Sequence, residues 1–393
     1  MPIHGTTIPP AILQRLRLCI DSLVAAGVNF AICREQGCEP RLFLQPDGGS
    51  STVVRLTGLS GRGFLFAPFQ ASPRSPIILI RREVPEEGWG NIIRRLEKFA
   101  RDNEITIRHP ATEPIHGAEV PEHPQLPGLG KTCPLPTDAY RDAFEIFREE
   151  VREGNFHKLV LARDQAVHGA FSPGATFLRA CTHCDDAMAS IVSTPMSGTW
   201  IGATPELLCS GSRNRWRTMA LAGTRACAGV DSCERWNDKN LEEQAMVADY
   251  IRELLARFCA DVQEKGPYTV HAGRLCHLRT DFFFRPLSLG DTAAIVEALH
   301  PTPAVCGLPK DQACAFIRET EPHDRRYYTG YLGWWGGSAE ASLYVNLRCM
   351  EMERGRAILH AGGGILAASE LGSEWRETCN KMGTMLALLR AGV

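Results

Sequence analysis

The chain has 393 residues, of which 44% are hydrophobic and 22% charged, so it can bury a substantial core and global disorder is not expected. Lys and Arg (43) nearly balance Asp and Glu (45), and without a basic excess we expect no nucleic-acid partner. No apolar run is long enough to cross a bilayer, and the first residues lack the pattern of a secretion signal. We therefore expect a soluble, cytoplasmic protein with no membrane partner.

The N-terminal hundred residues predict a mixed arrangement of helices and strands. Helical periodicity is found at 9–27 and 88–104, and short β-rich stretches lie between them, at 29–35, 41–45 and 75–83. Pro, Gly and His crowd residues 108–137, which predicts a long connecting loop. A helical pattern follows at 137–154, and strands alternate with helices from there to the end.

Fifteen cysteines are scattered through apolar contexts, which predicts buried free thiols that act as small hydrophobic side chains. Cys181 and Cys184 form a CxxC pair with His183 between them. A zinc or redox site of this kind needs a second ligand pair or a thioredoxin-like context, and the sequence offers neither. We therefore do not expect a metal at this pair.

The run FHKLVLARD predicts a strand with Lys158 at its start. Alternation places Lys158 on one face with Val160 and Ala162. A lysine beside small apolar groups can lose its hydration and then serve as a base. The alternative is a lysine that guards an exposed strand edge.

The run TWIGATPELLCSG predicts a strand that is broken at Pro205, with Glu206 directly after the break. A carboxyl group in this apolar context is hard to explain as part of a solvated face. Burial would raise its pKa and keep it protonated, as a general acid requires. The alternative is an ordinary glutamate in a turn.

Acidic side chains on two predicted helices indicate a divalent-cation site. Glu243 begins a largely apolar stripe of the helix predicted at 238–258. Glu374 and Glu377 share a face of a C-terminal helix with Lys381. Mg²⁺ is commonly held by one or two carboxylates with waters and substrate oxygens, so Glu243 and Glu377 would be the two halves of a site. The alternative is a solvated Glu377–Lys381 pair that contributes only about a few tenths of a kcal/mol.

A series of segments makes the chain resemble the chorismate-utilising enzymes, which include anthranilate synthase component I, aminodeoxychorismate synthase, salicylate synthase and isochorismate synthase. The segments run in the family's order and cover about residues 155–390. They are FHKLVLAR, GATPELL, ALAGTRA, KNLEEQAMV, LCHLRT, LHPTPAVCGLP, ETEPHDRRYYTGYLGW, LYVNLRC and AGGGILAASELGSEWRETCNKMGTML. Their number, order and spacing make chance similarity very improbable, whereas the N-terminal third is only loosely characteristic.

The resemblance implies a fold as well as an activity. It implies a single α+β domain over 1–393, with two large antiparallel sheets packed as a sandwich, helices outside and the active site in a cleft between them. Residues 1–107 would complete the sheets, 108–137 would be an internal connection, and 138–393 would form the chorismate-binding catalytic region. Stand-alone members of the family are often monomers, which is the expectation here.

The resemblance also implies the chemical roles. Lys158 is similar in position to the base that activates water at ring C2, Glu206 to the acid that protonates the leaving C4 hydroxyl, and His277 to a histidine near that hydroxyl. Mg²⁺ would be held by Glu243 and Glu377, with Glu374 close by. The remaining matches imply contacts with the substrate chorismate: Ala222, Gly223, Thr224, Ala304, Val305, Tyr328, Arg348, Gly362, Gly363, Gly364 and Lys381.

Two of these assignments have a clear physical basis. Tyr328 and Arg348 would hold the pyruvyl carboxylate, because a planar guanidinium can contact a carboxylate through two hydrogen bonds. The glycines at 362–364 and the AGT of 222–224 would let backbone amides approach the substrate, since those positions lack bulk.

The pair Ala304–Val305 distinguishes family members. The ammonia-using and salicylate-forming enzymes tend to carry Thr at the first position, whereas isochorismate synthases carry Ala followed by a branched apolar residue. The resemblance is therefore nearest to the isochorismate synthases, whose product can feed siderophore, salicylate or menaquinone biosynthesis. A salicylate synthase, a non-catalytic chorismate-family binding subunit and an unrelated Mg²⁺-dependent hydrolase are the alternatives. The chain departs from the usual family pattern at Gln244, where His is usual, and in AGGG, where AGAG is usual.

Overall fold

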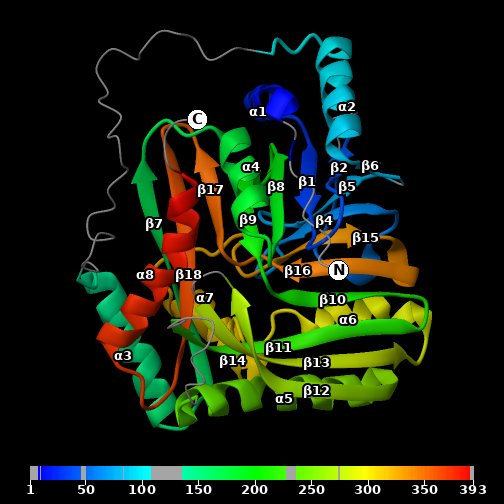
Figure 1. Cartoon of the computed structure of the whole chain (residues 1–393). Helices are drawn as coiled ribbons and strands as arrows, with labels where there is room; N and C mark the ends of the chain where they lie inside the picture. The colour runs from blue at the N-terminus through cyan, green and yellow to red at the C-terminus, as the bar shows by residue number, and fades with distance from the viewer. Residues whose placement is uncertain are drawn as a thin grey trace.

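Two large antiparallel sheets organise the chain, which this computed structural model describes for residues 8, 10–45, 50–82, 84–107, 135–226, 236–272 and 275–389. In Figure 1 the strands of the first sheet run mostly vertically and those of the second mostly horizontally. The predicted α+β class with two antiparallel sheets is confirmed. The predicted loop at 108–137 lies outside the described residues except for its last three positions.

The first sheet has nine described strands. In spatial order they are β14 (Gly307–Leu308), β7 (Lys158–His168), β18 (Arg356–Ile365), β17 (Cys349–Glu353), β9 (Gly198–Thr204), β8 (Met188–Thr194), β1 (Phe30–Arg34), β2 (Arg41–Leu44) and β6 (Glu86–Glu87).

The second sheet also has nine described strands. Their order is β12 (Cys259–Ala272), β13 (Leu275–Pro286), β11 (Arg215–Ala226), β10 (Leu207–Ser212), β16 (Glu340–Val345), β15 (Tyr331–Trp335), β4 (Gly63–Ala67), β5 (Ile77–Arg81) and β3 (Ser51–Val53). Strands from the first ninety residues therefore extend both sheets.

Helices cover the outer faces of the sheets. They are α1 (Pro10–Ala25), α2 (Trp89–Asp102), α3 (Asp138–Arg152), α4 (Pro173–His183), α5 (Asp238–Phe258), α6 (Thr292–Leu299), α7 (Lys310–Thr320) and α8 (Leu371–Leu388), with 3₁₀ turns at Leu56–Gly58, Leu289–Asp291 and Gly337–Ala339. In Figure 1, α5 runs along the second sheet beside β12 and β13, while α3 and α8 lie beside β7 and β18. Among the described residues no helix is both long and apolar enough to span a membrane.

The apolar core is divided by the sheets. One cluster packs α1, α2 and α4 on the first sheet, and another packs α5 and α6 on the second. A third lies between the sheets and includes Phe66, Trp200, Tyr327 and Tyr328. The interior between the sheets is therefore aromatic at one end, and the polar cavity described below opens beside it.

The chain passes between the sheets at two places that matter for the site. Strand β9 of the first sheet ends at Thr204, and β10 of the second begins at Leu207, so Pro205 and Glu206 form the crossing. The predicted break at Pro205 is thus confirmed. The chain crosses back between β16 and β17, at 346–348.

Most cysteines follow the prediction of free thiols. Eleven described cysteines are free, whereas Cys276 is disulfide-bonded, which corrects the prediction at that position. Cys181 is buried in α4 and Cys184 follows the helix end. Burial raises the pKa of both thiols, to about 12 for Cys181, so neither is a reactive thiolate.

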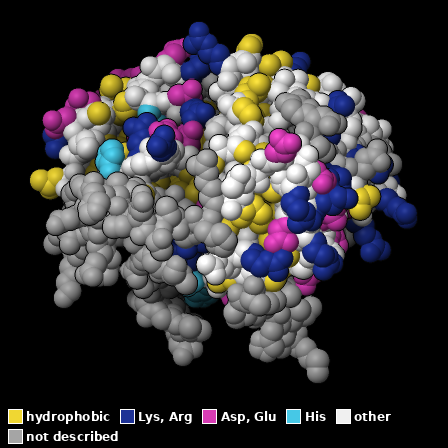
Figure 2. Space-filling view, turned by 90° about the horizontal axis from the view of Figure 1, so that it is seen from above, with side chains coloured by type: hydrophobic (Ala, Val, Ile, Leu, Met, Phe, Trp, Pro, Cys, Tyr) yellow, Lys and Arg dark blue, Asp and Glu magenta, His cyan; other side chains and the backbone are white. Residues whose placement is uncertain are grey.

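Charged side chains of both signs lie beside one another on the face shown in Figure 2. This pattern agrees with the nearly balanced charge of the sequence, −2 overall.

Candidate active site

A cavity of about 680 Å³, its open mouth included, lies between the two sheets. Its wall brings together most of the predicted site residues: Glu206, Ala222, Gly223, Thr224, Glu243, His277, Ala304, Val305, Tyr328, Arg348, Gly362, Gly363, Gly364 and Lys381. Lys158, Glu374 and Glu377 are not in the wall itself, but each lies against residues that are.

Glu206 is buried at the crossing between the sheets, with only 4% of its surface exposed. Burial raises its pKa to about 7, although the positive charges of Lys158, Lys381 and Arg348 act in the opposite direction. The carboxyl group therefore keeps its proton below about pH 7 and loses it above. The alternative of an ordinary solvated turn glutamate is wrong.

Lys158 begins β7 and is completely buried, which excludes the alternative of a lysine at an exposed edge. Strand β7 lies between β14 and β18, so its start is an internal position of the sheet. Its Nζ donates to Glu243 Oε1 at 2.8 Å. The cationic ammonium is thus held by a carboxylate at the cavity wall.

Three carboxylates at this end of the cavity are each paired with a lysine. Glu243 pairs with Lys158, Glu377 with Lys381 at 2.7 Å, and Glu374 with Lys239 at 2.5 Å. Burial would raise the pKa of Glu243, but Lys158 and the more distant lysines outweigh it and hold that pKa below its usual value. For Glu374 burial dominates, and its pKa is raised despite Lys239.

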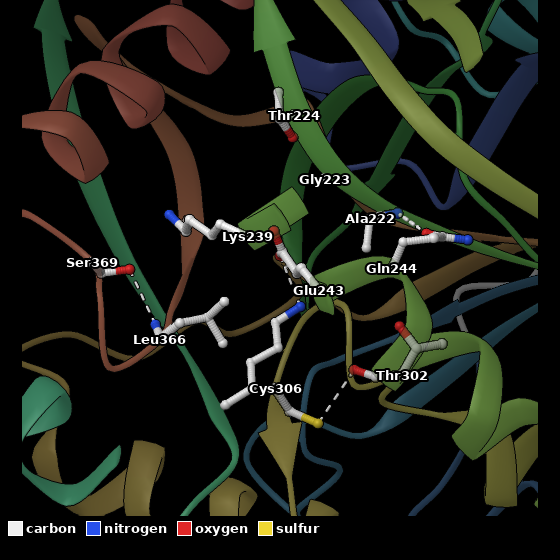
Figure 3. A network of polar contacts seen from close by, with 12 residues as sticks. Ala222, Gly223, Thr224, Lys239, Glu243, Gln244, Thr302, Cys306, Leu366 and Ser369 are labelled. Atoms are coloured by element: carbon white, nitrogen blue, oxygen red, sulfur yellow. Dashed lines mark hydrogen bonds and ion pairs between the residues drawn. The ribbon is translucent and has the colours of Figure 1, made fainter. Parts of the chain in front are cut away.

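Lys239 was not predicted. It lies four residues before Glu243 on α5, and i, i+4 residues share a helix face, so this spacing could have identified it. Figure 3 shows the side chains of Lys239 and Glu243, both from α5, near residues 222–224 of β11.

The lysine-paired acids surround two adjacent glycines of β18. A Cβ on Gly364 would lie 2.6 Å from Glu243 Oε1 and 2.9 Å from Lys158 Cε, and one on Gly363 would lie 3.3 Å from Glu374 Oε2. The absence of side chains at 363–364 thus makes room for the carboxylates and Lys158. The AGGG departure leaves this arrangement possible.

This donor set fits Mg²⁺ in its chemistry, because it offers carboxylate oxygens beside a cavity that admits water and substrate oxygens. Within the described residues no three His, Cys, Asp or Glu side chains are already gathered around one point. Mg²⁺ does not need such a cage, since one or two carboxylates suffice. The present geometry has lysine ammonium groups on the acids where a cation would be needed.

Gln244 is buried behind the wall and 2% exposed. Its side-chain oxygen accepts from Ala222 N–H at 2.9 Å, and its Nε2 donates to Ala220 O and Thr280 Oγ1. Figure 3 shows the Gln244 side chain directed toward Ala222, whereas the Glu243 side chain points in a different direction. The departure at this position therefore supplies a fully bonded side chain that ties α5 to β11.

Gly223 and His277 form one side of the cavity. Strand β11 changes register between Ala222 and Thr224, and Gly223 has φ +70°, where a Cβ would lie 3.1 Å from Asn240 O. The Gly223 carbonyl accepts from His277 Nδ1 at 3.2 Å. Burial, with Arg348 and Lys381, lowers the pKa of His277 to about 3, so its ring is neutral.

Arg348 lies at the second crossing between the sheets and adopts φ 47°, a left-handed conformation that is unfavourable for a residue with a side chain. Its Nη2 lies 3.4 Å from His277 Nε2, which can accept because Nδ1 donates to Gly223. Lys381 Nζ donates to Gly362 O at 2.7 Å. The cavity therefore has two fixed cationic groups that face a buried acid.

Sequence reasoning missed His360, which lines the cavity and is 5% exposed. Its ring stacks on Trp200 at 5.2 Å and on Tyr328 at 5.3 Å between centroids. Period-two alternation along β18 places it on the face of Gly362 and Gly364, so this pattern could have revealed it.

Comparisons with known proteins agree with the geometry. Residues 98–390 match a family described as chorismate binding enzyme. The salicylate biosynthesis isochorismate synthase of Pseudomonas aeruginosa is 34% identical over 256 residues, which are 61% of this chain and 52% of that protein. Isochorismate synthase DhbC of Bacillus subtilis is 33% identical over 283 residues, covering 65% and 68%. The matches span about half to two thirds of these relatives.

Solved structures with low identity share the fold. A putative 2,3-dihydroxybenzoate-specific isochorismate synthase from Bacillus anthracis superposes with a TM-score of 0.72 and 21% identity, covering 95% of this chain and 99% of that one. Anthranilate synthase component I from Streptococcus pneumoniae gives 0.61 and 19%, covering 91% of each chain. The fold implied by the sequence resemblance is thereby confirmed.

Proposed function

This chain belongs to the family of chorismate-binding enzymes, and from that premise we propose that it is an isochorismate synthase, which converts chorismate reversibly to isochorismate. The observation that carries the proposal is the buried carboxyl group of Glu206, with its pKa raised to about 7, in the same cavity as the Lys158–Glu243 pair. Relatives named as isochorismate synthases support it. The apolar pair Ala304–Val305 in the wall offers no hydroxyl group that would steer another nucleophile.

In the proposed reaction, water adds at ring C2 and the hydroxyl group at C4 leaves. Lys158 accepts the proton of the attacking water, and Glu206 donates its proton to the leaving oxygen, which departs as water. The ring double bonds shift between the two carbons. In the reverse direction the two groups exchange roles.

Chorismate has two carboxylates, and the cavity has cationic groups to bind them. We propose that Arg348 and Tyr328 hold the pyruvyl carboxylate, with neutral His277 near the C4 hydroxyl. Charge-assisted hydrogen bonds from a guanidinium fix the orientation as well as the charge. Such orientation is a large part of catalysis when both reacting groups are fixed in place.

Mg²⁺ is the proposed cofactor, with Glu243 and Glu377 as ligands and Glu374 beside them. When bound, it would neutralise and orient the ring carboxylate. Lys158 Nζ donates to Glu243 Oε1, so the residue proposed as the base and a proposed metal ligand are in direct contact.

The direct test is to incubate the purified protein with chorismate, with and without Mg²⁺, and to separate the products by chromatography. We expect isochorismate in reversible balance with chorismate, only when Mg²⁺ is present. Accumulating salicylate and pyruvate would instead identify a salicylate synthase. No turnover, with chorismate binding retained, would favour a binding subunit.

Replacing Glu377 with Gln is expected to weaken Mg²⁺ binding at least about 10-fold, because the amide keeps the shape but loses the ligand charge. Titration calorimetry of Mg²⁺ in the presence of chorismate measures this directly. Glu370→Gln, at the exposed start of the same helix, is the matched control. If Mg²⁺ affinity is the same in both variants, Glu377 is not a ligand.

A further inference from the structure

A second buried ion pair lies just behind the cavity wall, away from the lysine-paired acids. Glu321 directly follows α7, and its side chain is 1% exposed; that of Arg325 is 2% exposed. Arg325 Nε donates to Glu321 Oε2 at 2.7 Å, and its Nη2 bonds the other carboxylate oxygen. Burying such a pair costs desolvation energy that the ion pair itself often fails to recover, so a gain in stability does not explain its presence.

The pair takes the place of a neighbouring strand beside β7. Cys306, directly before β14, contributes a last backbone bond, which Val160 N–H donates to Cys306 O at 2.9 Å. Beyond that point Val160 O accepts from Arg325 Nη2 at 2.7 Å, and Ala162 N–H donates to Glu321 Oε1 at 2.8 Å. Two side chains thus form hydrogen bonds with backbone groups at the edge of β7, the strand that begins with Lys158.

The same guanidinium also holds two segments of the cavity wall. Its Nη1 donates to Val305 O at 2.7 Å and lies 3.5 Å from Thr329 Oγ1. Val305 and Thr329 both line the cavity, and Thr329 has φ 60°, a strained conformation that needs support from its surroundings. The ring of Phe69 closes the remaining face of the guanidinium, 4.4 Å away.

We propose that Glu321 and Arg325 form a positioning clamp that fixes three parts of the active site relative to one another. These parts are the β7 strand with Lys158, the turn with Val305, and the Tyr328–Thr329 segment. Neither Glu321 nor Arg325 lines the cavity. Through these backbone groups the clamp sets the distance between Lys158 and the ring of the bound substrate. This role rests on the proposed function above.

The clamp predicts a larger defect in turnover than in binding. Arg348 and Lys381, the cationic groups proposed to bind substrate, come from other segments, whereas Tyr328 lies in a clamped one. Arg325→Lys keeps the charge but loses the planar fork that serves Val160 O, Val305 O and the carboxylate together. We expect kcat to fall about 100-fold, the cost of a displacement of about 1 Å, with KM changed less than about 3-fold.

Two companion variants separate positioning from folding. Glu321→Gln keeps an oxygen acceptor for Ala162 N–H, so its kcat is expected to fall less, about 10-fold. The double variant Glu321→Leu/Arg325→Met removes both charges at similar volume, which commonly preserves stability. It is expected to fold and to have the low kcat of Arg325→Lys.

The neighbouring pair Arg326–Glu351 is the matched control. It is an arginine–glutamate pair that is more exposed than the clamp, and Arg326 bonds Ser197 O and Glu351, neither of which lines the cavity. Arg326→Lys and Glu351→Gln should therefore leave kcat within about 3-fold of the wild type. If Arg325→Lys changes kcat no more than these controls, or raises KM as much as it lowers kcat, the clamp is refuted.

Hydrogen exchange tests the clamp without turnover. The Ala162 amide should exchange faster in Arg325→Lys than in Arg326→Lys, because its acceptor is no longer held. Equal exchange in the two variants would overturn the clamp. A wild-type protein that does not convert chorismate would overturn the proposed function, whereas the exchange rates would still decide on the clamp.

Discussion

Replacing Lys158 with alanine is expected to reduce conversion of chorismate to isochorismate by at least about 1,000-fold, because the water attacking C2 then has no base. The residue is wholly buried and lies beside Glu243 at 2.8 Å, with its charge felt by Glu206, so no other described amine is in the same position. Chromatography of the products gives the rate. Chorismate binding, measured by calorimetry, should persist.

The same substitution has a second signature in stability. Without Lys158, Glu243 is left as a largely buried carboxylate with no direct partner, a loss of up to about 3 kcal/mol. Mg²⁺ should therefore raise the unfolding temperature of Lys158→Ala more than that of the wild type, since it supplies the missing positive charge.

Two further variants make the Lys158 result interpretable. Lys158→Met keeps most of the volume and should be equally inactive, which separates lost chemistry from a cavity. Lys98→Ala, on the exposed face of α2, should behave as the wild type. Retained turnover in Lys158→Met, or loss of chorismate binding together with intact turnover, would remove Lys158 from the base role.

The sequence predicted single elements better than their assembly. The α5 helix was predicted at its observed bounds because its apolar stripe is long and regular. The break at Pro205 was predicted because proline cannot donate a ladder bond inside a sheet. The two-sheet fold came only from the family resemblance, since alternation along a strand does not tell which sheet that strand joins.

The site shows the same division. Glu206 was suspected from a carboxyl in an apolar run, but its raised pKa depends on lying where the chain crosses between two sheets. Lys158 was predicted to be desolvated, which is correct, yet its ion pair with Glu243 joins residues 85 positions apart. Local patterns contain no information about that partner.

The positioning role proposed for the Glu321–Arg325 pair is an example of a feature that the sequence could not predict. The two residues are four apart, and no role was predicted for them from the sequence. Their importance lies in three backbone contacts with distant segments, and a backbone donor or acceptor leaves no trace in residue identity. Charge patterns in the sequence can identify ionic partners. They do not identify a side chain that bonds the backbone groups which a neighbouring strand would otherwise bond.

Glu206→Gln is the variant expected to separate catalysis from stability most clearly. The amide cannot donate an acidic proton to the C4 oxygen, so turnover should fall by at least about 1,000-fold at every pH, while its shape still fits the crossing. In the wild type, turnover toward isochorismate should decline as the pH rises through about 7, because Glu206 then loses its proton.

Whereas turnover falls in Glu206→Gln, its stability at neutral and higher pH should exceed that of the wild type. Burial raises the Glu206 pKa from 4.5 to about 7, so the folded state binds more protons than the unfolded state between these values. The contribution of Glu206 to the stability of the wild type is therefore lost as the pH rises through that window, by about 3 kcal/mol in total. Glu206→Gln has no such group and should match the wild type at pH 4 but exceed it at pH 8.

Urea unfolding of both proteins at pH 4, 6 and 8 measures the difference. A control with Glu297→Gln, whose carboxylate bonds Thr57 at an exposed site, should not remove the pH dependence. If Glu206→Gln is more stable than the wild type at pH 8 and has lost turnover, Glu206 is buried at a cost in stability and serves as the proton donor. If the pH dependence of stability is unchanged in Glu206→Gln, the carboxylate is solvated or neutralised, and the acid must be sought elsewhere in the cavity.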